Sequence, residues 1–153
     1  METSNLTRLR TDASMSGDQR ALLFKAREFL NAFPWCNAIQ TIYVGCIVEG
    51  VVGVFLFEII PSAPEIDKQL WVVVGDLPPA YLVTDQAQDP ASALKLYIKE
   101  MKAWVIAVKS GSAIDHIIPV NAKASMENAA ALDSRLNFLA KKVVRICGKG
   151  EQK

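Results

Sequence analysis

The stretches IQTIYVGCIVEGVVGVFLFEII, residues 39–60, and LWVVVGDLPPAYLVT, residues 70–84, decide the fold of this chain. Both are rich in β-branched and aromatic residues, which are typical of strands. Glu49-Gly50 divides the first stretch, because a glycine at the second loop position supplies the positive φ of a two-residue hairpin. Residues 76–79 divide the second stretch, since prolines cannot donate hydrogen bonds to a strand ladder. The sequence therefore predicts three to four antiparallel strands.

Apolar residues at helical spacing predict about three helices around these strands, over residues 16–33, 89–110 and 125–146. Ser16, with Gln three residues later, has the spacing of a capping box. Asp89 and the proline after it predict the start of a helix, with Asp89 as the N-cap and the proline as the first helical residue. One helix, then strands, then two helices predicts an α+β fold: an antiparallel meander sheet packed against helices in a two-layer sandwich.

Both faces of the expected strand at residues 51–60 are apolar. One face carries Phe55, Phe57 and Ile59, and the other carries Val52, Val54 and Leu56. A strand of this kind is an inner strand, or one whose second face is covered by a helix or by another subunit.

The length of 153 residues is that of one domain, and the composition of 51% apolar and 22% charged residues is that of an ordinary globular protein. We expect a single domain over residues 16–147, with flexible tails at residues 1–15 and 148–153. The net charge of +1 creates no global field that favours nucleic acid or an anionic membrane. Neither is expected as a partner.

The amino terminus is polar and lacks the apolar core of a secretory signal, which predicts a cytoplasmic protein. Cys36, Cys46 and Cys147 are odd in number, far apart in the sequence and next to apolar residues. This pattern favours buried reduced thiols over a disulfide framework. Glu49 and Glu58 interrupt the most apolar stretch, so it does not predict a membrane span.

The sequence predicts no catalytic residue, no metal site and no cofactor, and whether the chain is an enzyme stays open, with the balance against it. His116 is the single histidine, and although Asp115 precedes it, neighbours in an extended segment rarely reach the geometry of a general base. The phosphate-binding and nucleophile-elbow glycine motifs do not occur. One histidine and three scattered cysteines make a poor ligand set for zinc.

Five residues are candidates for a binding surface: Glu58, Trp71, Asp76, Tyr81 and Asp85. Aromatic residues beside a stiff Pro-Pro loop offer large contact area at low entropic cost. The competing interpretation places Trp71 in the core, leaves Tyr81 half-buried and lets Asp76 cap a turn. Glu58 interrupts an apolar strand face, so it is either a solvated edge residue or a pocket residue, since ionised groups are rarely buried unpaired.

Residues 38–140 also resemble a group of bacterial proteins without assigned activity. The resemblance rests on WVVVGDLPPAYLVTD at residues 71–85, YVGCIVEGVVGVFLFEI at residues 43–59 and IPVNA at residues 118–122. It implies no catalytic residues.

Two functions fit these observations. The first is a non-catalytic cytoplasmic protein-interaction module, of the immunity, inhibitor or adaptor type, or a homodimer formed through the sheet. The second is a small-molecule-binding protein or enzyme with a pocket between the sheet and the second helix. That pocket would be lined by Tyr43, Trp71, Tyr81 and Trp104, with Glu58 or Asp85 as a polar anchor.

Overall fold

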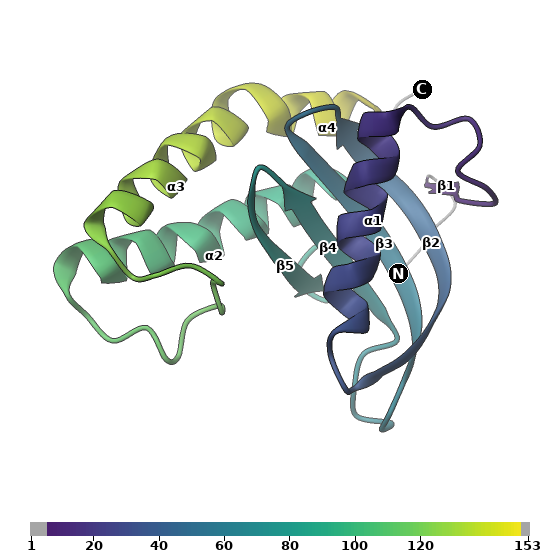
Figure 1. The fold of residues 1–153 in the computed structure, drawn as a ribbon, viewed down its shortest axis with the longest axis horizontal. Helices are drawn as coiled ribbons and strands as arrows, with labels where there is room; N and C mark the ends of the chain where they lie inside the picture. The colour runs from purple at the N-terminus through teal and green to yellow at the C-terminus, as the bar shows by residue number, and fades with distance from the viewer. Residues whose placement is uncertain (1–5, 151–153) are drawn as a thin grey trace.

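The computed structural model describes residues 6–150, which form one antiparallel sheet with helices on both faces (Figure 1). The outer parts of the two expected tails, residues 1–5 and 151–153, lie outside the described residues. The elements in chain order are β1 (Thr7–Arg8), α1 (Gly17–Asn31), β2 (Cys36–Val48), β3 (Val52–Pro61), β4 (Gln69–Gly75), β5 (Leu77–Val83), α2 (Pro90–Ser110), α3 (Met126–Phe138), the π-helical segment η1 (Leu139–Val143) and α4 (Val144–Gly150). The α+β class and the antiparallel meander are confirmed.

The sheet has the order β1-β2-β3-β4-β5 within the described residues, one strand more than expected. Its β2–β3 loop has three residues instead of two, because Val51 belongs to the loop and Val48 pairs with Val52. Gly50 has φ +76°, which supplies the expected left-handed position. Strand β5 forms one edge of the sheet and contains Pro78 and Pro79, so the expected break over residues 76–79 was wrong, and Asp76 alone separates β4 from β5.

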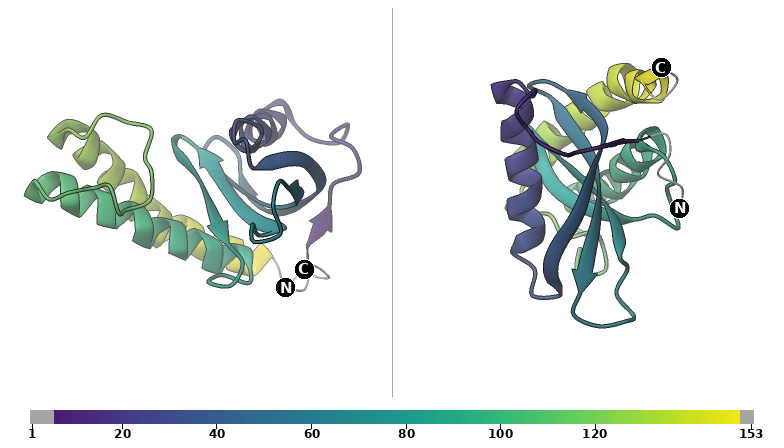
Figure 2. Two further views of the ribbon diagram at one scale, coloured as in Figure 1. Left: turned by 90° about the horizontal axis from the view of Figure 1, so that it is seen from below. Right: turned by 90° about the vertical axis from the view of Figure 1, so that its right-hand side faces the viewer.

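The sheet lies between two helical layers, so the fold has three layers instead of the expected two (Figure 2). Side chains of β3 alternate between the layers: Phe55 and Phe57 pack toward α1, whereas Val54 and Leu56 pack toward α2. Alternation along a strand therefore places one core on each side of the sheet. The second face of β3 is covered by a helix of the same chain, which is one of the two arrangements expected from the sequence.

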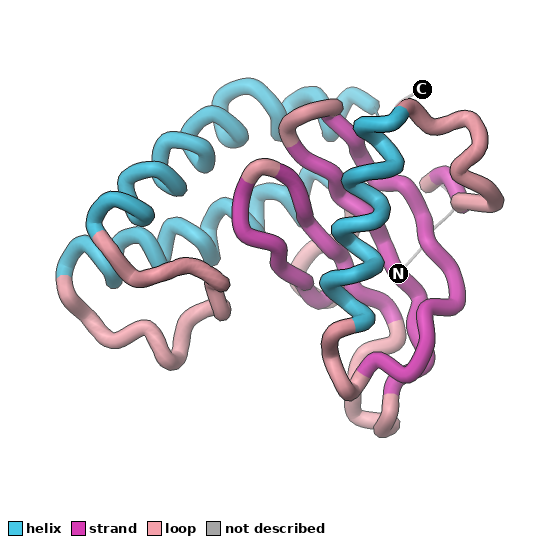
Figure 3. Tube along the Cα trace, viewed as in Figure 1, coloured by secondary structure: helices cyan, strands magenta, loops and turns pink. Residues whose placement is uncertain are grey.

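The helices begin where their caps predict. Ser16 caps α1 in a capping box with Gln19, and the Asp89 carboxylate accepts a hydrogen bond from Ser92 N at 2.7 Å. Helix α2 ends at Gly111, with φ +73°. The third expected helix is a continuous rod of α3, η1 and α4 that runs back along α2 (Figure 3).

A disulfide bond joins Cys46 of β2 to Cys147 of α4. The expectation of three reduced thiols was therefore wrong, and only the buried Cys36 is a free cysteine among the described residues. The two bonded residues are 101 positions apart, and the antiparallel return of α3 and α4 over the sheet brings them together. The disulfide fixes the end of the helical layer to the sheet.

The segment before α1 is part of the sheet. Thr7 and Arg8 form β1 and pair with Val44 and Tyr43 of β2, and Leu9 N donates a hydrogen bond to Ile42 O at 2.8 Å. The expected tail over residues 1–15 therefore contains a short strand that belongs to the sheet.

Among the described residues, no helix has both the length and the apolar character that crossing a membrane requires.

Candidate binding groove beside strand β5

Trp71 lies in the core. Its side chain is fully buried on the α2 side of β4, and its Nε1 donates a hydrogen bond to Ala87 O at 2.8 Å. A side chain covered in this way cannot contact a partner, so Trp71 is not a binding residue. The competing interpretation of Trp71 as a core residue holds.

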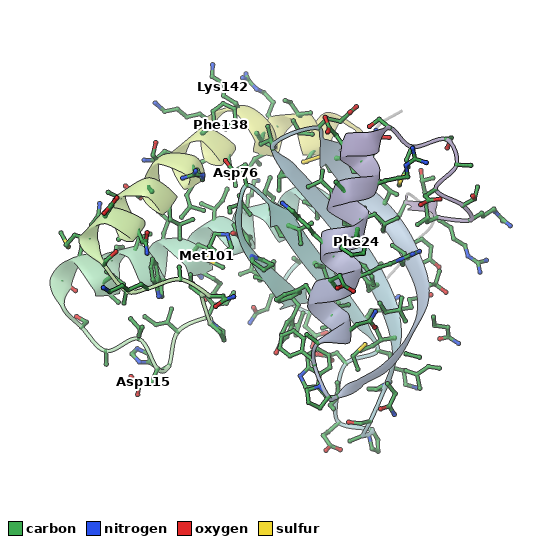
Figure 4. The ribbon with its side chains drawn as sticks, in the orientation of Figure 1. Phe24, Asp76, Met101, Asp115, Phe138 and Lys142 are labelled. Carbon is green, nitrogen blue, oxygen red and sulfur yellow. A yellow bond between two sulfur atoms is a disulfide. The ribbon has the colours of Figure 1, made fainter. Side chains whose placement is uncertain are left out.

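Asp76 and Asp85 are both exposed and lie at opposite ends of β5. Asp76 forms the β4–β5 turn, beside α3 in Figure 4, and its carboxylate accepts a hydrogen bond from Arg135 Nε at 3.3 Å. Asp85 follows β5 in a turn. The two carboxylates therefore do not form one site.

Glu58 is half-buried on the side of β3 that faces α2. Strand β3 pairs on both sides, so the interpretation of Glu58 as an edge residue was wrong. One carboxylate oxygen accepts a hydrogen bond from the Tyr43 hydroxyl at 3.4 Å, and the other accepts one from Gln69 Nε2 at 3.0 Å. These neighbours give Glu58 a structural role in joining three strands.

The pocket expected between the sheet and α2 is not formed by its predicted lining. Trp71 and Trp104 are both buried in the packed core of that layer. Tyr81 projects from the opposite face of the sheet, because it pairs with Val72, whose side chain packs toward α1. The predicted lining residues therefore lie on two sides of the sheet.

Tyr81 instead belongs to a cluster of four aromatic rings with Phe29, Phe33 and Trp35. Its ring centroid lies 5.4 Å from that of Phe33 and 5.2 Å from that of Trp35. Phe33 also stacks on Trp35 at 4.9 Å and meets Phe29 edge-on at 5.2 Å. Tyr81 is 37% exposed, and the other three rings are half-buried. Stacked and edge-on contacts of this kind are the arrangements that aromatic rings prefer, and part of each ring stays accessible.

An apolar hollow of about 560 Å³ opens beside this cluster. Its walls are the end of α1, the edge strand β5 and residues 118–121 of the α2–α3 linker. A second hollow of about 510 Å³ continues along α1 and shares Phe29 and Pro79 with the first. We call the two together the β5 groove. Its lining is Phe24, Lys25, Glu28, Phe29, Phe33, Val74, Gly75, Leu77, Pro79, Ala80, Tyr81, Ile118, Pro119, Val120 and Asn121.

Sequence reasoning found Tyr81 but not its three aromatic neighbours. Phe29 and Phe33 belong to the helical pattern expected over residues 16–33, and that pattern does not indicate their half-exposure, because the exposure depends on where β5 ends the sheet. The available signal was three aromatic residues in seven positions around Pro34. Helix capping does not account for three aromatic residues so close together at the end of a helix.

His116 and Asp115 lie exposed in the α2–α3 linker, and Asp115 is at its outer bend in Figure 4. Within the described part of the chain, no three His, Cys, Asp or Glu residues gather in a way that could hold a metal ion.

No protein-family model, curated protein or solved structure matches this chain. The resemblance of residues 38–140 to a bacterial group therefore stays a prediction.

Proposed function

We propose that this protein is a non-catalytic protein-interaction module, of the immunity, inhibitor or adaptor type, that binds an apolar segment of a partner protein in the β5 groove. The observation that carries this proposal is the cluster of Tyr81, Phe29, Phe33 and Trp35 at the wall of an open apolar groove. Rigid, partly exposed aromatic residues dominate the binding energy of protein interfaces.

The shape of the groove favours a polypeptide over a small molecule. A pocket for a small ligand encloses most of the ligand's surface. Here two open hollows continue into each other at Phe29 and Pro79, and Phe24, which is 64% exposed, extends the apolar surface along α1. An elongated apolar strip of this kind fits an extended or helical segment of a partner.

A small-molecule-binding protein or enzyme is the second candidate function. The hollow beside Tyr81 favours it, since about 560 Å³ lies within the range of ligand pockets. Its apolar and aromatic lining would select an apolar ring or chain.

The proposal does not include a homodimer formed through a face of the sheet, because α1 covers one face and α2 covers the other. We expect neither nucleic acid nor a membrane as a partner, because the charge of the chain is balanced. The expected cytoplasmic location stays a prediction, and the Cys46–Cys147 disulfide weighs against it, since disulfides are rare in reducing compartments.

The test compares the untagged protein with Tyr81→Ala and with Phe138→Ala as a matched control. Phe138 is also an exposed aromatic residue, 49% accessible, but it lies on α3 and lines neither hollow of the β5 groove. Native mass spectrometry of the protein from its own cells identifies what co-purifies. The affinity of the purified partner for each variant is then measured by calorimetry.

A polypeptide whose affinity falls at least about tenfold in Tyr81→Ala and stays unchanged in Phe138→Ala supports the proposal. A co-purifying small molecule that Tyr81→Ala releases supports the second candidate. A partner that binds both variants as tightly as the wild type would contradict an interaction through the β5 groove.

A further inference from the structure

A polar groove lies on the other side of α1, away from the β5 groove. It has a volume of about 510 Å³, and its walls come from the segment around β1, from α1 and from β2. We call it the arginine groove. Its lining is Arg8, Leu9, Arg10, Thr11, Asp12, Arg27, Asn31, Ile39, Gln40, Thr41 and Ile42.

Positive charge is concentrated in the arginine groove. Three arginines, Arg8, Arg10 and Arg27, and one acidic residue, Asp12, line it, which leaves a formal charge of +2 in a chain whose total is +1. Arg8 pairs with Tyr43, so its side chain leaves β1 on the α2 side of the sheet. Arg10 and Arg27 are the two arginines that can meet a ligand beside α1. None of the three guanidinium groups forms an ion pair within residues 6–148. Charged groups without a partner in the protein are available to a ligand of opposite charge.

The walls of the arginine groove are held in place by the backbone. Leu9 N donates to Ile42 O at 2.8 Å, and the Leu9 side chain packs with the α1-side core between Arg8 and Arg10. On the opposite wall, Arg27 and Asn31 are four residues apart, which makes them neighbours on one face of α1. The backbone therefore holds the two walls, and with them the Cα positions of Arg10 and Arg27, on either side of the groove.

The donor set matches an anion. A guanidinium group offers planar pairs of N–H donors that fit carboxylate and phosphate oxygens. The amides of Asn31 and Gln40 add neutral hydrogen-bonding groups, and Ile39 and Ile42 add apolar surface. We propose that the arginine groove is a binding site for a small organic anion that carries carboxylate or phosphate groups. This site is independent of the proposed function of the β5 groove.

The test uses two probes, citrate and inorganic pyrophosphate, titrated separately into the full chain at low ionic strength by calorimetry. We expect at least one probe to bind with 1:1 stoichiometry and a Kd of about 1 mM or tighter. The probe that binds distinguishes carboxylate from phosphate as the recognised group. Added sodium chloride should weaken the binding, since it screens exposed charges.

Three variants locate the site: Arg27→Gln, Arg10→Gln and, as a matched control, Arg20→Gln. Arg20 is exposed on the same helix as Arg27 but does not line the groove. Arg27→Gln and Arg10→Gln should each weaken binding at least about fivefold, and Arg20→Gln should leave it unchanged. Unchanged circular dichroism spectra of all three variants exclude unfolding as the cause.

Two outcomes would overturn the proposal. The first is that neither probe binds to the wild type below about 10 mM. The second is that Arg20→Gln weakens binding as much as Arg27→Gln, since a general effect of surface charge would then explain it.

Discussion

The hydroxyl group of Tyr97 on α2 donates a hydrogen bond to the carbonyl oxygen of Pro78 on β5 at 2.5 Å. It joins the helical layer to the edge strand that borders the β5 groove. Burial raises the pKa of Tyr97 above its usual value of 10.0. The folded protein therefore keeps this proton at a pH at which the unfolded chain releases it.

This difference predicts a loss of stability in alkali. Above pH 10 the unfolded state binds fewer protons than the folded state, so the free energy of unfolding falls as the pH rises. Tyr97→Phe should cost about 1 to 2 kcal/mol at pH 7, because the Pro78 carbonyl loses its donor. The variant should also show a smaller fall above pH 10 than the wild type. Urea unfolding at pH 7, 9 and 11 measures both effects, and identical pH profiles would contradict the prediction.

The Cys46–Cys147 disulfide predicts a large effect of reduction on stability. It closes a loop between residues 101 positions apart, and chain-entropy arguments assign about 4 to 5 kcal/mol to a loop of this length. The double variant Cys46→Ala/Cys147→Ala should lose a similar amount, measured by urea unfolding. Cys36→Ala, at the free cysteine, is the control, and its unfolding should depend on dithiothreitol as strongly as that of the wild type. Wild-type stability that does not respond to dithiothreitol would show that the bond is absent in solution.

Gly75 at the β4–β5 turn should not tolerate a side chain. A Cβ atom there would lie 2.2 Å from the Val51 carbonyl oxygen, and φ is +155°. We expect Gly75→Ala to cost about 3 kcal/mol or more, because backbone atoms of the β2–β3 loop have to move. Gly17→Ala is the control, since a Cβ at Gly17 meets nothing within 4 Å, and it should be neutral or slightly stabilising. Equal melting temperatures of the two variants would refute this account of the turn.

Truncation of Trp71 and of Tyr81 should separate the core from the surface. Trp71→Ala removes a fully buried side chain and should cost about 3 to 5 kcal/mol. Tyr81→Ala removes a ring that is 37% exposed at the sheet edge, and we expect a loss of about 1 kcal/mol. Denaturant unfolding of both variants is the measurement. A Tyr81→Ala loss as large as that of Trp71→Ala would make Tyr81 a core residue and remove it from the β5 groove.

The sequence predicted the sheet and the caps because both follow from local patterns. Alternation along residues 52–59 assigned each side chain of β3 to its layer, and the cap residues Ser16 and Asp89 placed the starts of α1 and α2. The two apolar faces of β3 indicated that both are covered. They did not indicate that α1 would cover one of them, since that depends on how the helix returns to the sheet.

The features that were missed depend on contacts between distant residues. Nothing in the spacing of Cys46 and Cys147 indicates that α4 returns to β2. Strand β1 is two residues long, and its pairing with β2 is decided by backbone hydrogen bonds that leave no apolar pattern. The aromatic cluster joins Tyr81 to rings about fifty positions earlier. Patterns along the chain predict the apolar face of each helix and strand. They do not predict which residues of that face stay exposed at the edge of the sheet.

The two prolines of β5 also limit how copies of this protein can assemble. An unprotected edge strand is a template on which further strands can add, and such growth leads to aggregates. Pro78 and Pro79 are consecutive in β5, so one of the two positions faces β4 and the other faces the free edge; the proline at the free edge offers no N–H donor, and a neighbouring chain finds an interrupted ladder. The edge can therefore present an aromatic surface to a partner without at the same time seeding a fibril.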